Sequence, residues 1–377
     1  MSLTSELRGR GPLSDWFATQ FPGGRFTARV TAHLDAQPAP TRPGRAVRAG
    51  HWPAVGGAVG TRLAWAVEPA PPYYALFGSH NAGLIGWDDV NRAGARFPTH
   101  AAGTYPGRPE HALAQRPTPS GWTDIAADET GPQTAPRQSG TAPAIVADFC
   151  ARAAGFLERV PPGGWGTRGE EKVLARIALV LTDWEQAYRG PGLDQPAQAA
   201  LAAARHRDDA GELLAHVDPA ALADTTAVID RCRRDGLLEQ LADATGVSGA
   251  LLRGHAFPVF AERWADGDLL LAPADGEATT LIDVKTVTAA RSAATVRSWL
   301  HQLLGYAYLA SLYCPEWQLG RVGLALTRHG HVVAWDLDEL AAALCGGLCH
   351  TGAFARHRAG FDAAFRATLS ARGLTAS

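Results

Sequence analysis

Two short apolar runs stand close together in the last third of the chain. Residues 267–272 and 279–286 are mostly aliphatic, and a Gly/Asp/Glu turn at 275–277 separates them. Apolar runs of this length, bounded by turn residues, are typical of β-strands. We therefore expect a hairpin in which the two runs form adjacent antiparallel strands.

The apolar positions change to helical spacing after the second run. A helix is expected over about 295–313, and strands are expected over 317–327 and 331–335, with a turn at His329-Gly330. The pattern over 337–372 is again helical, with breaks at glycines. An order of strand, strand, helix, strand, strand predicts a mixed sheet that is flanked by helices.

Helical spacing also dominates the middle of the chain. The clearest example is 169–189, where apolar residues recur at helical intervals before a Gly-Pro-Gly stop. By contrast, 1–54 and 98–143 are rich in glycine and proline and have few periodic apolar positions, which predicts irregular structure. Further helices are expected over 55–68, 142–160, 196–216, 219–232 and 235–245.

These elements predict an α/β (α+β) protein with a mixed central sheet and a partly helical, partly irregular N-terminal half. We expect residues 1–140 to form an irregular N-terminal region with a long Pro/Gly-rich loop. Residues 141–377 are then a helical segment followed by the sheet-containing core at 255–340. A chain of 377 residues suits one large domain or two small ones.

The predicted hairpin carries the most informative charged residues. Asp268 opens the first strand, and Asp283 and Lys285 lie two apart in the second, so alternation sends both to one face. In a hairpin Asp268 lies beside Asp283, and two adjacent carboxylates repel each other unless a cation separates them. Mg²⁺ or Mn²⁺, which prefer oxygen ligands, suit such a pair. A nearby lysine can then stabilise charge on a phosphate or orient water.

These residues resemble the PD-(D/E)xK nuclease superfamily, in which an acid on one strand precedes (D/E)-x-K on the next. The RecB-type branch adds a Gln, often with a Tyr four residues later, and here Gln302 and Tyr306 match that pair. The stretch is also similar to bacterial proteins with an ADADL…LIDIKTT…QLLGYALL pattern. The resemblance implies a restriction-endonuclease-like core, Mg²⁺- or Mn²⁺-dependent cleavage of DNA, and a possible setting in bacterial antiphage defence.

The resemblance also implies a further acidic ligand from an upstream helix. The candidates are Glu170, Glu171 and Glu185, of which Glu185 is preferred, although Glu185 also suits a surface pair with Arg189. His255 is a candidate ligand because some RecB-type enzymes use a histidine before the first strand. Glu262 and Asp266 are nearer alternatives in the sequence.

Other interpretations of the same residues stay open. Asp283 and Lys285 also suit an ordinary cross-strand ion pair, although the apolar residues around them argue for burial, which is costly for unpaired charge. Gln302 and Tyr306 also suit simple helix packing. The alternative function is therefore a catalytically weak, nuclease-fold subunit that binds or scaffolds within a protein assembly.

Composition narrows the functional classes. The formal charge is −2 and charged residues are 19% of the chain, so a strongly basic nucleic-acid surface is not expected, and a protein partner or homo-oligomer is left open. No apolar stretch is long enough to span a membrane and no signal core opens the chain, which predicts a cytoplasmic protein. A P-loop and a G-x-S-x-G elbow are also absent from the sequence.

Overall fold

The computed structural model describes residues 2–98, 140–190, 192–247, 251–261, 264–272, 278–290, 292–346 and 352–373. Most of the loop predicted over 98–143 lies outside the described residues. No helix in the described ranges is both long and apolar enough to cross a membrane.

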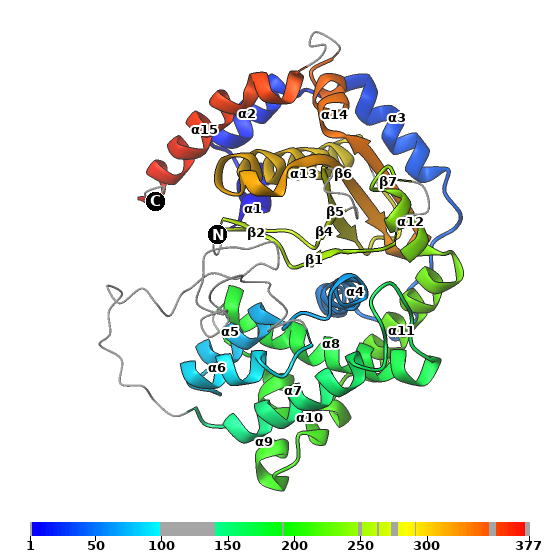
Figure 1. Ribbon diagram of the computed structural model, residues 1–377, viewed down its shortest axis with the longest axis vertical. Coiled ribbons are helices and arrows are strands. Elements are labelled where there is room, and N and C mark those ends of the chain that lie inside the picture. The colour runs from blue at the N-terminus through cyan, green and yellow to red at the C-terminus, as the bar shows by residue number, and fades with distance from the viewer. Residues whose placement is uncertain are drawn as a thin grey trace.

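A five-stranded mixed sheet forms the centre of the protein (Figure 1). Its order is β1-β4-β5-β6-β7; β5 pairs antiparallel with β4 and parallel with β6. The parallel pair is joined through helix α13 (Ala293–Tyr313), which crosses one face of the sheet. The predicted hairpin and mixed sheet are therefore confirmed. The strands are β1 (Gly254–Ala256), β4 (Leu269–Leu271), β5 (Thr279–Lys285), β6 (Leu319–Leu326) and β7 (His331–Asp336).

The central strands are apolar on both faces because helices cover both. Leu270 and Leu281 belong to the core on the α13 face, whereas Leu269 and Ile282 belong to the core on the opposite face. This division follows from the alternation of side chains along a strand. A separate two-stranded unit, β2 (Val259–Ala261) and β3 (Ala265–Asp266), lies between β1 and β4 in the sequence.

The α13 face is completed by helices from both ends of the chain. In Figure 1 α2 lies alongside α15 and α3 lies near α14, and α1 packs against α13. These helices are α1 (Leu3–Arg8), α2 (Pro12–Gln20), α3 (Gly24–Asp35), α14 (Leu337–Leu344) and α15 (Ala353–Ala371). The expectation of irregular structure over 1–54 missed the first three. Their start signals are Ser2, which caps α1, and Pro12, which opens α2.

The other face is covered by a larger helical layer. Helix α4 (Trp52–Val67) contacts β1 and β4, and α8 (Arg168–Arg189) packs behind it (Figure 1). The helix predicted over 196–216 is split, because Asp208 adopts a left-handed conformation that ends α9. The remaining helices of this layer are α5 (Tyr73–Asn81), α6 (Trp87–Gly94), α7 (Pro143–Leu157), α9 (Gln195–Arg207), α10 (Gly211–Ala215), α11 (Pro219–Arg234) and α12 (Leu237–Asp243).

Both cores draw on residues from before and after position 140. On the α13 face α2 packs on α15, and on the other face α5 packs extensively on α8. A division at 140 therefore does not coincide with a division between hydrophobic cores in the part of the chain that the structure describes.

The N-terminal helices should contribute substantially to stability. Phe17 on α2 is fully buried and contacts the rings of Trp16, Phe21, His301 and Phe361. Phe17→Ala is expected to lower the free energy of unfolding by about 3–5 kcal/mol, because it leaves a cavity in a closely packed cluster. Urea denaturation measures this, and a loss below about 1 kcal/mol, as at a surface position, would contradict the packing.

Candidate active site

The strand register brings Asp268 and Asp283 together. Leu269 lies opposite Ile282, so one further step along the ladder places Asp268 opposite Asp283 at the end of the strands. Residues opposed in an antiparallel pair project from the same face. The main-chain N–H of Val284 donates to Asp268 Oδ2 at 2.6 Å, which holds the Asp268 carboxylate against the neighbouring strand. The two carboxylates are therefore side by side on the α13 face.

Gly267 allows this close approach. A Cβ atom at this position would lie 2.9 Å from Phe260 Cε2 and 3.0 Å from Leu281 Cδ1, which is closer than normal packing permits. Gly267 therefore has a steric role: without a side chain, the backbone can pass close to Leu281 immediately before Asp268.

Lys285 lies two residues beyond Asp283 and on the same face. Its ammonium nitrogen is 2.5 Å from Asp283 Oδ2 and donates to Gln302 Oε1 at 3.0 Å. The chain contains only two lysines, Lys172 and Lys285, among 35 lysines and arginines. At the position in this cluster the chain has the compact ammonium of lysine, although nearly all its other basic residues are arginines.

Helix α13 supplies the other half of the cluster. Gln302 accepts from Lys285 and donates through Nε2 to Tyr306 Oη at 2.8 Å and to Thr4 Oγ1 at 2.9 Å. The ring of Tyr306 stacks on Phe260 with 5.1 Å between centroids. Gln302 and Tyr306 are both buried and on the face that meets Lys285, as their spacing of four residues predicted.

The electrostatics of the pair are unfavourable without a cation. Burial of the carboxylate, followed by the charge of Asp283, raises the pKa of Asp268 to about 7, although the Val284 N–H and Lys285 act in the opposite direction. Burial also raises the pKa of Tyr306 well above its ordinary value, so Tyr306 is a neutral phenol at physiological pH. Near pH 7, therefore, Asp268 is present in both its protonated and its charged form.

Glu185 is not brought to this pair. It lies on α8, which packs against α4 and α5, and α4 stands between α8 and the sheet (Figure 1). The carboxylates of Asp268 and Asp283 project from the opposite face, toward α13. The assignment of Glu185 as a metal ligand is therefore not supported, since helical periodicity identified the apolar face of α8 but not which side of the sheet it covers.

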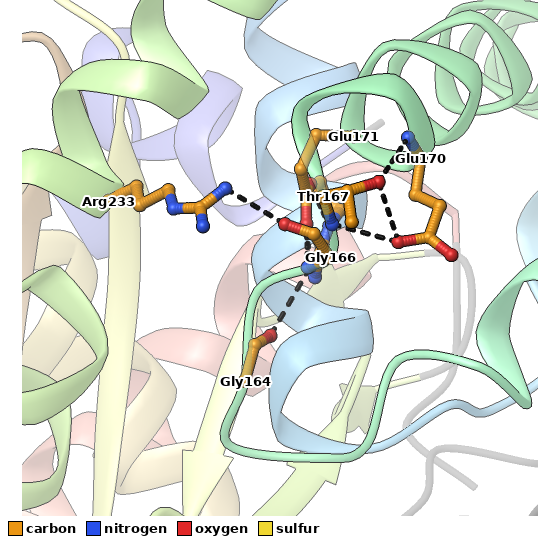
Figure 2. A network of polar contacts seen from close by, with 7 residues as sticks. Gly164, Gly166, Thr167, Glu170, Glu171 and Arg233 are labelled. Atoms are coloured by element: carbon orange, nitrogen blue, oxygen red, sulfur yellow. Dashed lines mark hydrogen bonds and ion pairs between the residues drawn. The ribbon is translucent and has the colours of Figure 1, made fainter.

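Glu170 and Glu171 belong to a different polar network, at the start of α8 (Figure 2). Glu171 is 2% exposed, pairs with Arg62 at 2.7 Å and accepts from the Gly166 N–H at 2.6 Å. Glu170 accepts from the Thr167 N–H at 2.8 Å and completes a capping box. Both glutamates therefore have structural partners: one holds α8 to α4, and the other caps the helix.

His255 is paired with Glu68 and not with the aspartates. Its Nδ1 is 3.6 Å from Glu68 Oε2, and the same oxygen accepts from the main-chain N–H of Ala256 at 3.0 Å. This pairing joins the edge strand β1 to the C-terminal end of α4. Nothing in these contacts supports His255 as a ligand, and Glu262 lies outside the described residues.

Asp266 and Thr4 also interact with this cluster, although little in the sequence indicated that they would lie there. The charge of Asp266 helps to raise the pKa of both Asp268 and Tyr306, so Asp266 is a further acid within electrostatic range of the pair. Thr4 reaches the cluster from a segment 298 residues away from Gln302. The spacing of Asp266 and Asp268 could have indicated the former, whereas no local pattern indicates Thr4.

The donor set suits a hard cation with retained water. No group of three or more His, Cys, Asp or Glu side chains in the described ranges is arranged to hold a metal. Mg²⁺, however, is commonly held by one or two carboxylates together with several waters. Asp283 Oδ2 is buried and faces the Lys285 ammonium at 2.5 Å. Two adjacent carboxylates, one of them facing an ammonium, would hold such an ion together with several waters.

Comparison with known proteins gives no match, whether with family models, curated proteins or solved structures. The resemblance to the PD-(D/E)xK superfamily is therefore an expectation from the sequence.

The raised pKa of Asp268 should be visible in the pH dependence of stability. The folded protein holds this proton more tightly than the unfolded chain, so the stabilisation is complete below the ordinary carboxyl pKa and is lost as pH rises through about 7. Asn at this position cannot titrate. Between pH 5 and pH 8, with a chelator present, the wild type should lose more stability than Asp268→Asn. Thermal melts at both pH values measure the difference, and parallel behaviour of the two proteins would contradict it.

Proposed function

We propose that the protein is a metal-dependent nuclease that hydrolyses phosphodiester bonds in DNA. The observation that carries the proposal is the pair of opposed carboxylates, Asp268 and Asp283, with Lys285 on the same face. This is the arrangement that the resemblance to PD-(D/E)xK nucleases implies. Each of the five residues proposed for catalysis lies in one connected cluster at one end of the hairpin, which simple packing on α13 does not require.

The topology supports the same proposal. Strands β1, β4 and β5 form an antiparallel unit, and α13 then leads to β6, which is parallel to β5. This is a mixed sheet flanked by helices, which agrees with the core expected from the resemblance. In this proposal the helical layer around α4 and α8 and the N-terminal helices are additions around that core.

The residues have separable roles in the proposed reaction. Asp268 and Asp283 would hold Mg²⁺ or Mn²⁺, with the main-chain carbonyl after Asp283 as a further ligand. The ion would supply charge stabilisation at the phosphate and activation of water. Lys285 directs a positive charge at the same place, where it would stabilise negative charge that develops on the phosphate. Gln302 holds the ammonium through Oε1, and Tyr306, a neutral phenol stacked on Phe260, holds the Gln302 amide and lines the site.

The charge balance bears on how DNA would be recognised. With a formal charge of −2, the chain lacks the general basic excess that drives tight nonspecific binding. Binding would then depend on local arginines or on a partner protein that presents the DNA. A role in bacterial defence is compatible with either arrangement.

The second candidate is a nuclease-fold protein that binds or scaffolds without cutting. The observation that favours it is the Lys285 ammonium, which is already 2.5 Å from Asp283 and balances that charge without a metal. The absence of a third clustered ligand among the described residues points the same way.

Cleavage assays separate the two candidates. Plasmid and linear DNA are incubated with Mg²⁺ or Mn²⁺ and wild-type protein, Asp283→Ala or Lys285→Ala. We expect metal-dependent cleavage that is abolished in Asp283→Ala and reduced about 10²–10³-fold in Lys285→Ala, since one group that stabilises developing charge contributes that much. Lys172→Ala is the matched control, because it removes the other lysine, which is exposed, and should cut normally. A wild type that cleaves no form of DNA or RNA would favour the scaffold.

Substitution of Gln302 should change the cleavage rate more than it changes the affinity for the metal. Its contacts are with Lys285, Thr4 and Tyr306, so Gln302→Ala is expected to slow cleavage while Mn²⁺ affinity stays nearly unchanged. Calorimetric titration of Mn²⁺ beside the cleavage assay tests this. Loss of metal binding would mean that Gln302 is itself a ligand, and unchanged cleavage would mean that it only packs.

A further inference from the structure

The first helix of the chain contributes a side chain to the proposed active site. Thr4 on α1 accepts a hydrogen bond from Gln302 Nε2 at 2.9 Å, and the other end of the same amide accepts from Lys285 at 3.0 Å. A single planar amide thus connects the Thr4 hydroxyl to the ammonium that faces Asp283. Whatever fixes one end of that amide also fixes the other.

Hydrogen-bonding capacity determines which way the Gln302 amide points. An ammonium can only donate, so the group that faces Lys285 must be the oxygen Oε1. The NH₂ group then faces away from Lys285 and needs acceptors, because Gln302 is only 6% exposed. Thr4 Oγ1 and Tyr306 Oη are those acceptors. If the Thr4 hydroxyl is removed, one buried N–H loses its acceptor, and the orientation that presents Oε1 to Lys285 is less strongly favoured.

Helix α1 is held in place by packing that is independent of Thr4. The side chain of Leu3 is fully buried, and its main-chain N–H donates to the Trp264 carbonyl at 2.9 Å. Across from it, α13 has Gly305, where a Cβ would lie 3.0 Å from a Leu3 methyl group. Ser2 and Ser5 form a reciprocal cap at the start of the helix. Thr4 therefore lies on a helix that other residues anchor, so substitution of Thr4 should leave α1 in place.

We propose that Thr4 is a positioning residue of the active site: it fixes the Gln302 amide, and through it the Lys285 ammonium beside Asp283. The catalytic part of this inference rests on the proposed nuclease function. The positional part concerns only Lys285, and it can be measured whether or not the protein cleaves DNA.

Lysine reactivity tests the positional part directly, because the chain has only two lysines. Acetylation of Lys285 and Lys172 by a small acylating reagent is followed by peptide mass spectrometry in the wild type, Thr4→Val and Thr4→Ser. Valine has nearly the shape of threonine but cannot accept the hydrogen bond, whereas serine can. Relative to the wild type, Lys285 should react about 3- to 10-fold faster in Thr4→Val, as expected for the loss of one hydrogen bond, and near the wild-type rate in Thr4→Ser. Lys172 is the internal reference.

A matched control separates positioning from loosening of the helix. Ser5→Ala removes a hydroxyl from the same helix and with it one half of the capping box, and the hydrogen bonds of that hydroxyl are to Ser2. It should leave Lys285 reactivity unchanged. If Thr4→Val and Ser5→Ala alter Lys285 equally, or if neither does, Thr4 has no positioning role and the proposal is overturned.

Kinetics test the catalytic part. In Thr4→Val we expect kcat for DNA cleavage to fall about 3- to 10-fold with KM nearly unchanged, and Thr4→Ser should restore it. A rise in kcat would overturn the proposal, because α1 would then obstruct the site. If Lys285 is acetylated faster in Thr4→Val and the wild type cuts no nucleic acid, the positional inference holds and the nuclease function is rejected, so the two failures are distinguishable.

Discussion

The repulsion between two carboxylates is the constraint around which the centre of this protein is organised. Asp268 and Asp283 are opposed at the end of a strand pair whose neighbouring residues are aliphatic and buried. The protein reduces the repulsion in several ways. The Val284 N–H donates to one carboxylate, the Lys285 ammonium faces the other, and the pKa of Asp268 is raised so that it can carry a proton. A divalent cation between the two carboxylates would offset the remaining repulsion.

The rest of the fold places this pair between two helical layers. The sheet is covered on one face by α13 and the terminal helices, and on the other by α4 with α8 behind it (Figure 1). Burial of the sheet on both faces raises the free energy of the charged groups, and it strengthens the electrostatic effect of each neighbouring group on them. The α13 crossover has two functions. It connects the parallel strands β5 and β6, and it brings Gln302 and Tyr306 over the end of β5. Buried ion pairs distant from the site, such as Arg62 with Glu171, fix the helical layer.

Local periodicity was enough to predict that the residues of this cluster lie together. Alternation in one strand placed Asp283 and Lys285 on one face, the turn at 275–277 implied that Asp268 would be opposite, and helical spacing placed Gln302 with Tyr306. Each inference depends on geometry within a few residues. Glu185 lies on the layer beyond α4, and His255 lies beside Glu68. Neither placement could be predicted from the sequence, because both depend on tertiary packing. The helices in 1–54 were missed because glycine, proline and arginine are frequent there, a composition that predicts irregular structure. Thr4 could not be predicted at all, since its partner is 298 residues away.

The central claim is that Asp268 and Asp283 form a cation site, and a crystal structure of the protein grown or soaked with Mn²⁺ tests it most directly. Anomalous scattering locates the ion without reference to any assumed activity. The account predicts one peak bound by carboxylate oxygens of both aspartates, at about 2.0–2.3 Å as for other small oxygen-bound divalent ions, with water completing the coordination. A structure at millimolar Mn²⁺ with no peak there, and with Lys285 still paired to Asp283, would contradict it.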